Sequence, residues 1–199
     1  MAFANNINKV INNNQQTLIR CMQINLQHSR VATDNIMSLI QQDHIDIVFV
    51  QEPYLIQNKT AGITRTHRTY ISDEDKSRAA IIIANDSIDA VLIKQLCDRD
   101  KVVLELRYKN TRTLAASMYL DITEEIDEKT AKVDEILKYN NGSGIIIAMD
   151  SNSRSTGWYD NKTNARGKKM EEYLISRDLH IMNEESERAT FQSRRGRTT

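Results

Sequence analysis

The sequence predicts a single α/β domain, with sheets in the middle and helices outside, and three observations support this prediction. Short apolar segments rich in β-branched residues recur along the chain and predict buried strands. Three other segments place apolar residues at helical spacing and predict amphipathic helices. The order of these segments is mixed, with strand–helix–strand units at both ends and a run of strands between them, which is typical of an α/β protein.

The chain begins with a segment, residues 1–17, that is rich in Asn and Gln and lacks the apolar core of a signal peptide. We expect it to be a flexible leader that carries no chemistry. The domain itself is expected over residues 18–199. Its first strand, residues 18–26, alternates apolar and polar side chains. Residues 30–43 then place Ile36 and Ile40 near one face of a helix.

The middle of the chain contains most of the predicted strands. Residues 45–54 form a short apolar run with β-branched side chains, and five further runs follow at close spacing: residues 69–72, 78–85, 89–94, 101–108 and 113–121. Residues 124–140 predict an amphipathic helix, with Val133 and Ile136 facing inward. The Gly-containing segment after it leads into a buried strand at residues 144–150. A last helix begins at residue 164, and a short strand at residues 180–183 follows it.

Composition narrows the class of protein. Hydrophobic residues make up 40% and charged residues 27% of the 199 residues, which indicates a globular chain and argues against disorder. Lys and Arg together number 27, as do Asp and Glu, so the net charge neither requires nor excludes a nucleic-acid partner. No apolar run approaches the roughly 20 residues of a membrane span, so we expect no membrane partner.

Polar side chains stand where several predicted strands end. They are Asn25, Glu52, Tyr119, Asp150 and Asn152. Ligands of open α/β sheets bind in the crevice beyond the strand ends, so a site is expected there. Taken singly, each residue has another interpretation, because carboxylates after strands also form turns or cap helices, and a tyrosine also serves as a core aromatic.

Two of these strand ends carry carboxylates. Glu is a poor turn residue, and Pro53 disfavours the α region for Glu52, so we expect Glu52 to be extended and its side chain to leave the strand end. Asp150 and Asn152 are two apart and, in an extended chain, point to the same side. Glu52 and Asp150 together suit Mg²⁺, which one or two carboxylates commonly hold with water and substrate phosphate. The histidines lack the spacing of a zinc site.

Basic residues after these motifs are candidates for phosphate contact. Arg166 and Lys168 follow the Asp-x-Asn segment, and Arg194, Arg195 and Arg197 lie in the tail. Arg166 and Lys168 are equally compatible with the exposed start of a helix. The arginines of the tail are equally compatible with a solvated terminus. For Trp158, two roles remain open: stacking on a nucleic-acid base, or covering the end of the hydrophobic core.

Four segments, in this order, resemble the strands of the exonuclease–endonuclease–phosphatase superfamily: QINLQHS, DIVFVQEPY, SMYLD and IIIAMDSNSRSTGW. NARGKKMEEYLISRDLHIMNE and ATFQSRRGRTT are similar to one branch, the apurinic-type endonuclease domain that precedes the reverse transcriptase of non-LTR (LINE-type) retrotransposons. The resemblance covers about residues 18–199. It implies a two-sheet α/β sandwich with outer helices, and hydrolysis of phosphodiester bonds with Mg²⁺ or Mn²⁺.

The resemblance also implies a role for each residue. Glu52 would bind the metal, and Asp150 would position or deprotonate the attacking water. Asn152 and Asn25 would help to orient the nucleophile and the metal's ligands, and Tyr119 would support the scissile phosphate. The implied activity is that of a DNA endonuclease that nicks target DNA for retrotransposition.

The resemblance implies that DNA is the partner and that a reverse transcriptase region lies on the same longer polyprotein. It also implies a nuclear or cytoplasmic location. The family pattern continues beyond Thr199 with a strand bearing an Asp and a strand bearing an Asp-His pair. We therefore expect that these final strands are missing and that activity is impaired. The alternatives are a non-catalytic remnant that binds nucleic acid, and a phosphatase that acts on small phosphoesters.

Overall fold

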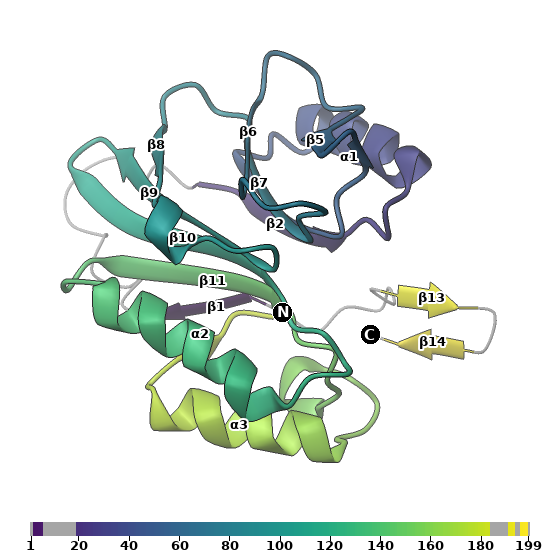
Figure 1. Cartoon of the computed structure of the whole chain (residues 1–199), viewed down its shortest axis with the longest axis vertical. Helices are drawn as coiled ribbons and strands as arrows, with labels where there is room; N and C mark the ends of the chain where they lie inside the picture. The colour runs from purple at the N-terminus through teal and green to yellow at the C-terminus, as the bar shows by residue number, and fades with distance from the viewer. Residues whose placement is uncertain (1, 6–18, 184–190, 194–195, 199) are drawn as a thin grey trace.

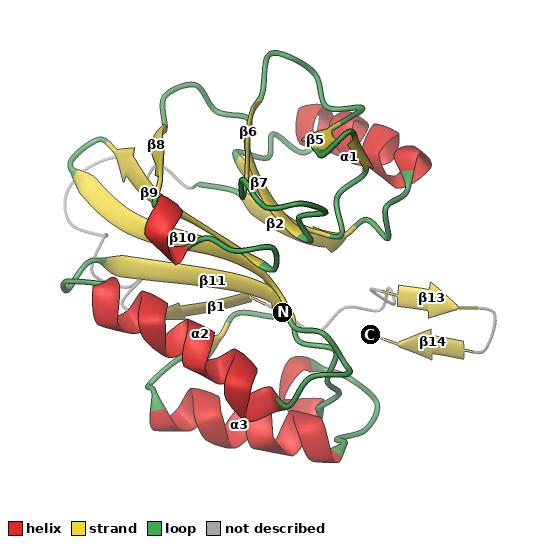
Figure 2. Ribbon diagram, viewed as in Figure 1, coloured by secondary structure: helices red, strands yellow, loops and turns green. Residues whose placement is uncertain are grey.

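The computed structural model describes residues 2–5, 19–183, 191–193 and 196–198. Its elements form layers, in which two β-sheets pack face to face and helices cover the outer faces (Figure 1 and Figure 2). The predicted two-sheet α/β sandwich with outer helices is therefore confirmed. Within the described residues, no helix has the length and apolar character needed to cross a membrane.

The smaller of the two sheets has the strand order β2-β3-β7-β6. Its strands are β2 (Cys21–Asn25), β3 (Ile47–Gln51), β6 (Arg68–Ile71) and β7 (Ala79–Ile83). Helix α1 (Arg30–Gln42) connects β2 to β3, so these two strands are parallel, whereas β7 runs antiparallel to β3. Ser29 caps α1 by accepting a hydrogen bond from the Ala32 N–H, which satisfies a free donor of the first turn.

The larger sheet has the order β12-β1-β11-β10-β9-β8. Its strands are β1 (Ala2–Asn5), β8 (Asp89–Leu92), β9 (Lys101–Tyr108), β10 (Thr111–Tyr119), β11 (Gly144–Asp150) and β12 (His180–Ile181). Helix α2 (Ile126–Tyr139) connects β10 to β11, which are parallel, and α3 (Ala165–Ser176) lies beside α2 on the same face (Figure 1). All three predicted helices are present.

Two parts of the chain behave differently from their sequence pattern. Residues 2–5 of the predicted leader form β1, which pairs antiparallel with β11 and β12; residues 6–18 lie outside the described residues. Two short hairpins were not anticipated, because their strands are too short to show a period: β4 (Leu55–Ile56) with β5 (Lys59–Thr60), and β13 (Phe191–Ser193) with β14 (Gly196–Thr198).

The core is layered because successive strand residues face opposite sides of a sheet. In β3, Phe49 packs between the sheets, while its neighbours Val48 and Val50 pack under α1. A third apolar cluster lies between the larger sheet and the α2 and α3 helices, and it contains Trp158, which is 6% exposed. Of the two interpretations of Trp158, the structure therefore supports closure of the core.

Candidate active site

The predicted site residues stand at one edge of both sheets, because two pairs of parallel strands end there. Asn25 at the end of β2 is paired with Gln51 at the end of β3, and Tyr119 at the end of β10 is paired with Asp150 at the end of β11. Glu52 follows Gln51 directly. Parallel strands bring their carboxyl ends to the same edge, so residues far apart in sequence meet without any long loop.

Asp150 connects the two sheets at the site. The side-chain amide of Asn25 donates to Asp150 Oδ2 at 2.8 Å, and the backbone N–H of Asn152 donates to Asp150 Oδ1 at 3.1 Å. Asn25 is itself oriented, because its Oδ1 accepts from the Gln27 N–H at 2.8 Å. Each carboxylate oxygen thus has one protein donor, which fixes the carboxylate plane and leaves further lone pairs for a water molecule.

Asn152 does not share a face with Asp150 in the way an extended chain would place it. Its φ of 47° lies in the left-handed region, so the chain turns after β11, and its side-chain amide donates to the Leu120 carbonyl at 3.0 Å. The expectation of an extended segment was wrong, because a short polar residue adopts this region readily and the turn satisfies the Asp150 carboxylate. The Asn152 amide thereby connects β11 with the loop after β10.

Glu52 is also turned rather than extended. Its φ is 47°, so the predicted extended conformation was wrong; the following Pro53 disfavours only the right-handed α region. Its backbone N–H donates to the Arg78 carbonyl at 2.8 Å, which continues the β3–β7 pairing past the end of the strand. A non-glycine residue in this region at a strand end costs of order 1–3 kcal/mol and is more frequent at functional sites.

His28 lies beside Glu52 and was missed in the sequence. Its Nε2 is 3.6 Å from Glu52 Oε1, and its Nδ1 is 3.1 Å from the Pro53 carbonyl oxygen. The backbone N–H of His28 also donates to the Glu52 carbonyl at 2.9 Å. The spacing between histidines did not identify His28 as a site residue. The contact between His28 and Glu52 joins the loops after β2 and β3, which are brought together by the parallel pairing of these strands.

Tyr119 lies close to both carboxylates. Burial raises the pKa of its phenol, and the nearby carboxylates of Glu52 and Asp150 raise it further, while a hydrogen bond with the Asn152 side chain acts in the opposite direction. A phenol with a raised pKa stays protonated at neutral pH and remains a hydrogen-bond donor. The structure therefore brings Asn25, Glu52, Tyr119 and Asp150 together at one place.

Arg78 is a second site residue that sequence reasoning missed. It precedes β7, and because β7 is antiparallel to β3, its first residues lie at the same sheet edge as Gln51 and Glu52. Its guanidinium carbon lies 4.6 Å from the centre of the Tyr119 ring. The sequence feature that could have identified it is an arginine directly before a fully apolar strand. In the structure, the start of that strand lies beside the carboxyl end of β3.

The predicted basic residues divide into three groups. The guanidinium of Arg166 donates to the backbone carbonyls of Ser151, Asp121 and Glu124 at 2.6–3.1 Å, so it connects two loops at the site. The side chain of Lys168 is 74% exposed on α3, 3.9 Å from Glu172.

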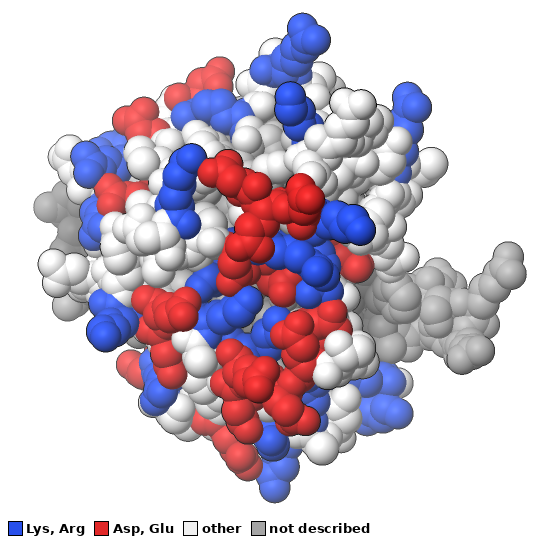
Figure 3. All heavy atoms as spheres, in the orientation of Figure 1, with Lys and Arg blue, Asp and Glu red and all other residues white. Residues whose placement is uncertain are grey.

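The remaining predicted basic residues belong to the tail. Arg194 and Arg195 lie outside the described residues, and of Arg197 only the backbone, in β14, is described. On the face shown in Figure 3, acidic and basic side chains are interleaved over the end of β10 and the start of α2.

The donor set of the site fits a hard divalent cation. Glu52 and Asp150 supply carboxylate oxygens, and Asn25 and Asn152 supply amide oxygens, whereas no cluster of three His, Cys, Asp or Glu side chains occurs among the described residues. Mg²⁺ does not require such a cluster, because it keeps several waters and binds through one or two carboxylates plus substrate phosphate. Zinc prefers four nitrogen or sulfur ligands and does not fit.

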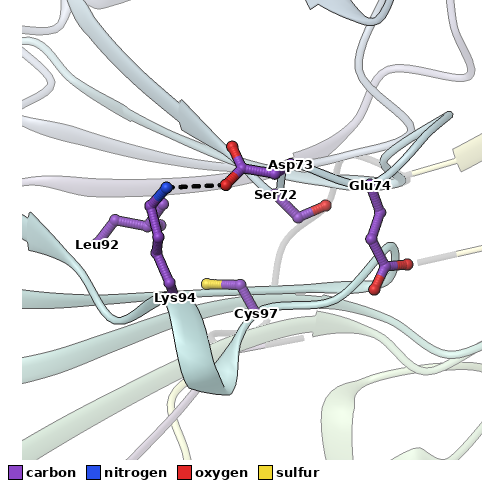
Figure 4. A pocket seen from close by; sticks show the side chains of 6 residues that line it. All are labelled: Ser72, Asp73, Glu74, Leu92, Lys94 and Cys97. Atoms are coloured by element: carbon purple, nitrogen blue, oxygen red, sulfur yellow. Dashed lines mark hydrogen bonds and ion pairs between the residues drawn. The ribbon is translucent and has the colours of Figure 1, made fainter.

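Two cavities of the described surface lie away from the site. Ser72, Asp73, Glu74, Leu92, Lys94 and Cys97 line a small cavity of about 90 Å³, in which Lys94 pairs with Asp73 (Figure 4). A second cavity of about 300 Å³ lies by His44 and His67, at the opposite edge of the smaller sheet. Neither of these two cavities is lined by a strand-end residue of the site.

Known proteins share parts of this sequence and its fold. Residues 113–199 match a family model described as "Endonuclease-reverse transcriptase", a stretch that contains Tyr119 and Asp150. No curated protein matches the chain. Among solved structures, the endonuclease domain of TRAS1, a telomere-specific non-LTR retrotransposon, is similar at 25% identity and a TM-score of 0.77, over 88% of this chain and 78% of that one.

Two more distant structures share the fold. TDP2 of D. rerio, solved with a single-strand DNA product, has 15% identity and a TM-score of 0.52, over 69% of this chain and 62% of its own. The mannosyl-6-phosphatase Bt3783 of Bacteroides thetaiotaomicron has 14% identity and a TM-score of 0.57, over 80% and 70%. The chain has the fold of the exonuclease–endonuclease–phosphatase superfamily and resembles the endonuclease domain of a non-LTR retrotransposon.

Proposed function

We propose that the chain is a metal-dependent endonuclease that hydrolyses phosphodiester bonds in DNA and nicks target DNA for retrotransposition. The observation that carries this proposal is the hydrogen bond between Asn25 and Asp150, which joins the carboxyl ends of strands from both sheets beside Glu52 and Tyr119. The likeness to the TRAS1 endonuclease domain supports DNA as the substrate. A reverse transcriptase region on the same polyprotein belongs to the same proposal.

Asp150 acts on the attacking water. Its two oxygens each accept one protein hydrogen bond, from Asn25 and from the Asn152 N–H, so the carboxylate is held in one orientation and accepts the proton of a water molecule. The water oxygen forms the new bond to phosphorus as the ester P–O bond breaks, and the departing alkoxide takes a proton from solvent. Fixing the base in place avoids reorganisation during the reaction.

Glu52 would hold the metal, with Mg²⁺ or Mn²⁺ as the ion. When bound there, such an ion supplies Lewis-acid stabilisation of the charge on the phosphate oxygens. The Glu52 side chain is 21% exposed, so its carboxylate remains accessible from the strand edge. The Arg78 carbonyl and the His28 N–H hold the Glu52 backbone from two sides, which directs the side chain toward the site.

Tyr119 would donate a hydrogen bond to a phosphate oxygen. A tyrosine hydroxyl is protonated at neutral pH, and burial raises its pKa further above that range, so it is available as a donor. A donor aimed at developing negative charge contributes more in a partly buried site than in water.

Nicking of a supercoiled plasmid tests this proposal. We expect conversion of supercoiled to open-circular DNA that requires Mg²⁺ and stops when the metal is chelated. Asp150→Ala should lower the rate by about 10²-fold or more, the usual range for loss of a positioned base. Asp73→Ala, at a carboxylate that is 81% exposed and away from the site, is the matched control and should keep full activity.

A second variant separates metal binding from proton transfer. Glu52→Gln should raise the Mg²⁺ concentration needed for half-maximal rate, and Glu172→Gln, at an exposed position on α3, should not. Turnover confined to nucleotides and inositol phosphates would replace the endonuclease proposal with a small-molecule phosphatase. Plasmid binding without nicking at any metal concentration would support a non-catalytic remnant.

A further inference from the structure

Arg78 contacts the site through both its backbone and its side chain. Its backbone carbonyl accepts from the Glu52 N–H at 2.8 Å, and its own N–H donates to the Arg99 carbonyl at 2.6 Å. Its side chain is only 12% exposed and points along the strand edge toward the Tyr119 side of the site. One residue therefore touches the backbone that carries Glu52 and the ring of Tyr119.

Two carboxylates hold the guanidinium in a single orientation. Nε and Nη2 donate to the two oxygens of Asp100 at 2.6 and 2.9 Å, and Nη1 donates to Asp121. The side chain of Asp100 is 9% exposed, and the backbone carbonyl of Asp100 accepts from the Tyr119 N–H at 2.8 Å. The paired, planar fork fixes direction as well as charge, which a lysine ammonium does not do.

The fixed guanidinium covers one face of the Tyr119 ring. The distance of 4.6 Å from its central carbon to the ring centre lies within the range of a cation–π contact. The ring belongs to Tyr119, the last residue of β10, which is paired with Asp150 at the end of β11 and follows the last residue paired with β9. The guanidinium therefore limits the positions that the ring can take on this side.

We propose that Arg78 is the positioning residue for Tyr119: its guanidinium, anchored by Asp100 and Asp121, sets the orientation from which the phenol hydroxyl reaches the scissile phosphate. The inference rests on the proposed function, which gives Tyr119 its contact with phosphate. Arg78 does not itself touch the substrate. It acts through the ring, so its effect on the rate depends on the Tyr119 hydroxyl.

A double-mutant cycle tests this dependence. Arg78→Lys keeps the charge and loses the fork, and we expect it to lower kcat for plasmid nicking by about tenfold while KM changes less than about twofold. In a Tyr119→Phe background, the same substitution should change kcat by less than about twofold, because no hydroxyl remains to be positioned. An equal loss in both backgrounds would overturn the proposal.

The chain offers a matched control. Arg177 makes the same kind of fork with Asp134, at 2.6 and 2.9 Å, and lies 5.4 Å from the ring centre of Tyr173, at the end of α3. Arg177→Lys should leave kcat and KM unchanged. If Arg78→Lys does not fold, Asp121→Asn removes one anchor and leaves the Asp100 fork; it should lower kcat in the same direction, by less.

A spectroscopic readout separates failure of this inference from failure of the proposed function. In ¹³C-tyrosine-labelled protein, Arg78→Lys should shift and broaden the Tyr119 ring signals and leave those of Tyr173 in place. If the wild-type chain does not nick DNA, the proposed function fails. The positioning of Tyr119 by Arg78 is then tested by the Tyr119 ring signals alone. Ring signals that stay unchanged in a folded Arg78→Lys protein would overturn the positioning role.

Discussion

Gly167 in the first turn of α3 offers the sharpest test of how the site loop is held. Helix interiors normally favour alanine over glycine by about 1 kcal/mol, so Gly167→Ala should stabilise the protein on propensity alone. The structure predicts the opposite sign. A Cβ built at Gly167 would lie 1.9 Å from the Arg154 carbonyl oxygen and 2.7 Å from its carbon, and backbone atoms at this distance have to move.

The magnitude follows from the contacts that this movement would break. Asn164 caps α3 by accepting from the Gly167 N–H at 2.7 Å and from the Arg154 N–H at 3.2 Å, and its own N–H donates to the Arg154 carbonyl at 2.9 Å. Loss of three hydrogen bonds at about 0.5–1.5 kcal/mol each, less about 1 kcal/mol from propensity, leaves a net destabilisation of about 0.5–3.5 kcal/mol.

Urea denaturation followed by circular dichroism measures this change as a shift in the transition midpoint at constant slope. Lys168→Ala is the matched control, because it is exposed on the same turn and should change the free energy of unfolding by less than about 0.5 kcal/mol. A Gly167→Ala protein at least as stable as wild type would refute the argument, since it would mean that α3 and the loop before it do not pack this closely.

Two further predictions concern buried polar groups. Gln51 is fully buried and its amide donates to Ser117 Oγ at 3.0 Å, so Gln51→Glu should lower the free energy of unfolding at pH 7 by about 3 kcal/mol or more, whereas Gln51→Met should cost about 1–2 kcal/mol. The difference in free energy of unfolding between the two variants, measured by urea denaturation, should decrease as the pH falls toward 4, because the introduced carboxylate becomes protonated. A difference that does not change with pH would contradict a buried charge. The Thr123 N–H and the Arg78 guanidinium hold the pKa of Asp121 well below its usual range, so its stabilising contribution is present above about pH 4 and is lost as the pH falls through the lowered value. Thermal melts between pH 7 and pH 2.5 should therefore show a flatter profile for Asp121→Asn than for wild type, and identical profiles would count against this contribution.

Most of the fold followed from periodicity. The strands β3 and β7 are short apolar runs because both of their faces are covered, and the three helices carry one apolar face each because only one face is covered. The β4–β5 hairpin and β1 were not expected, because two to four residues do not establish a period. Strand pairing also had no local signal, since it joins segments as far apart in the sequence as Phe3 and Ile181.

The candidate site was predictable in its residue types but not in its contacts. Polar residues after apolar strands were visible as a pattern, and the resemblance to the superfamily added their order. The left-handed turns at Glu52 and Asn152 were not predictable, because they are stabilised by the Arg78 and Leu120 carbonyls on other strands. Arg78 and His28 escaped notice for the same reason: both belong to the site only through pairing with a neighbouring strand.

The sequence alone determined which segments are buried, which are strands or helices, and which polar residues stand at strand ends, since these depend on local composition and period. Only the tertiary structure decided which strand ends meet. Asn25 and Asp150 are neighbours because the two sheets pack face to face with their parallel pairs ending at one edge. Tertiary packing also decided that Arg166 connects two site loops and that Trp158 closes the core. Such contacts depend on long-range burial and hydrogen bonding, which no single segment of the chain specifies.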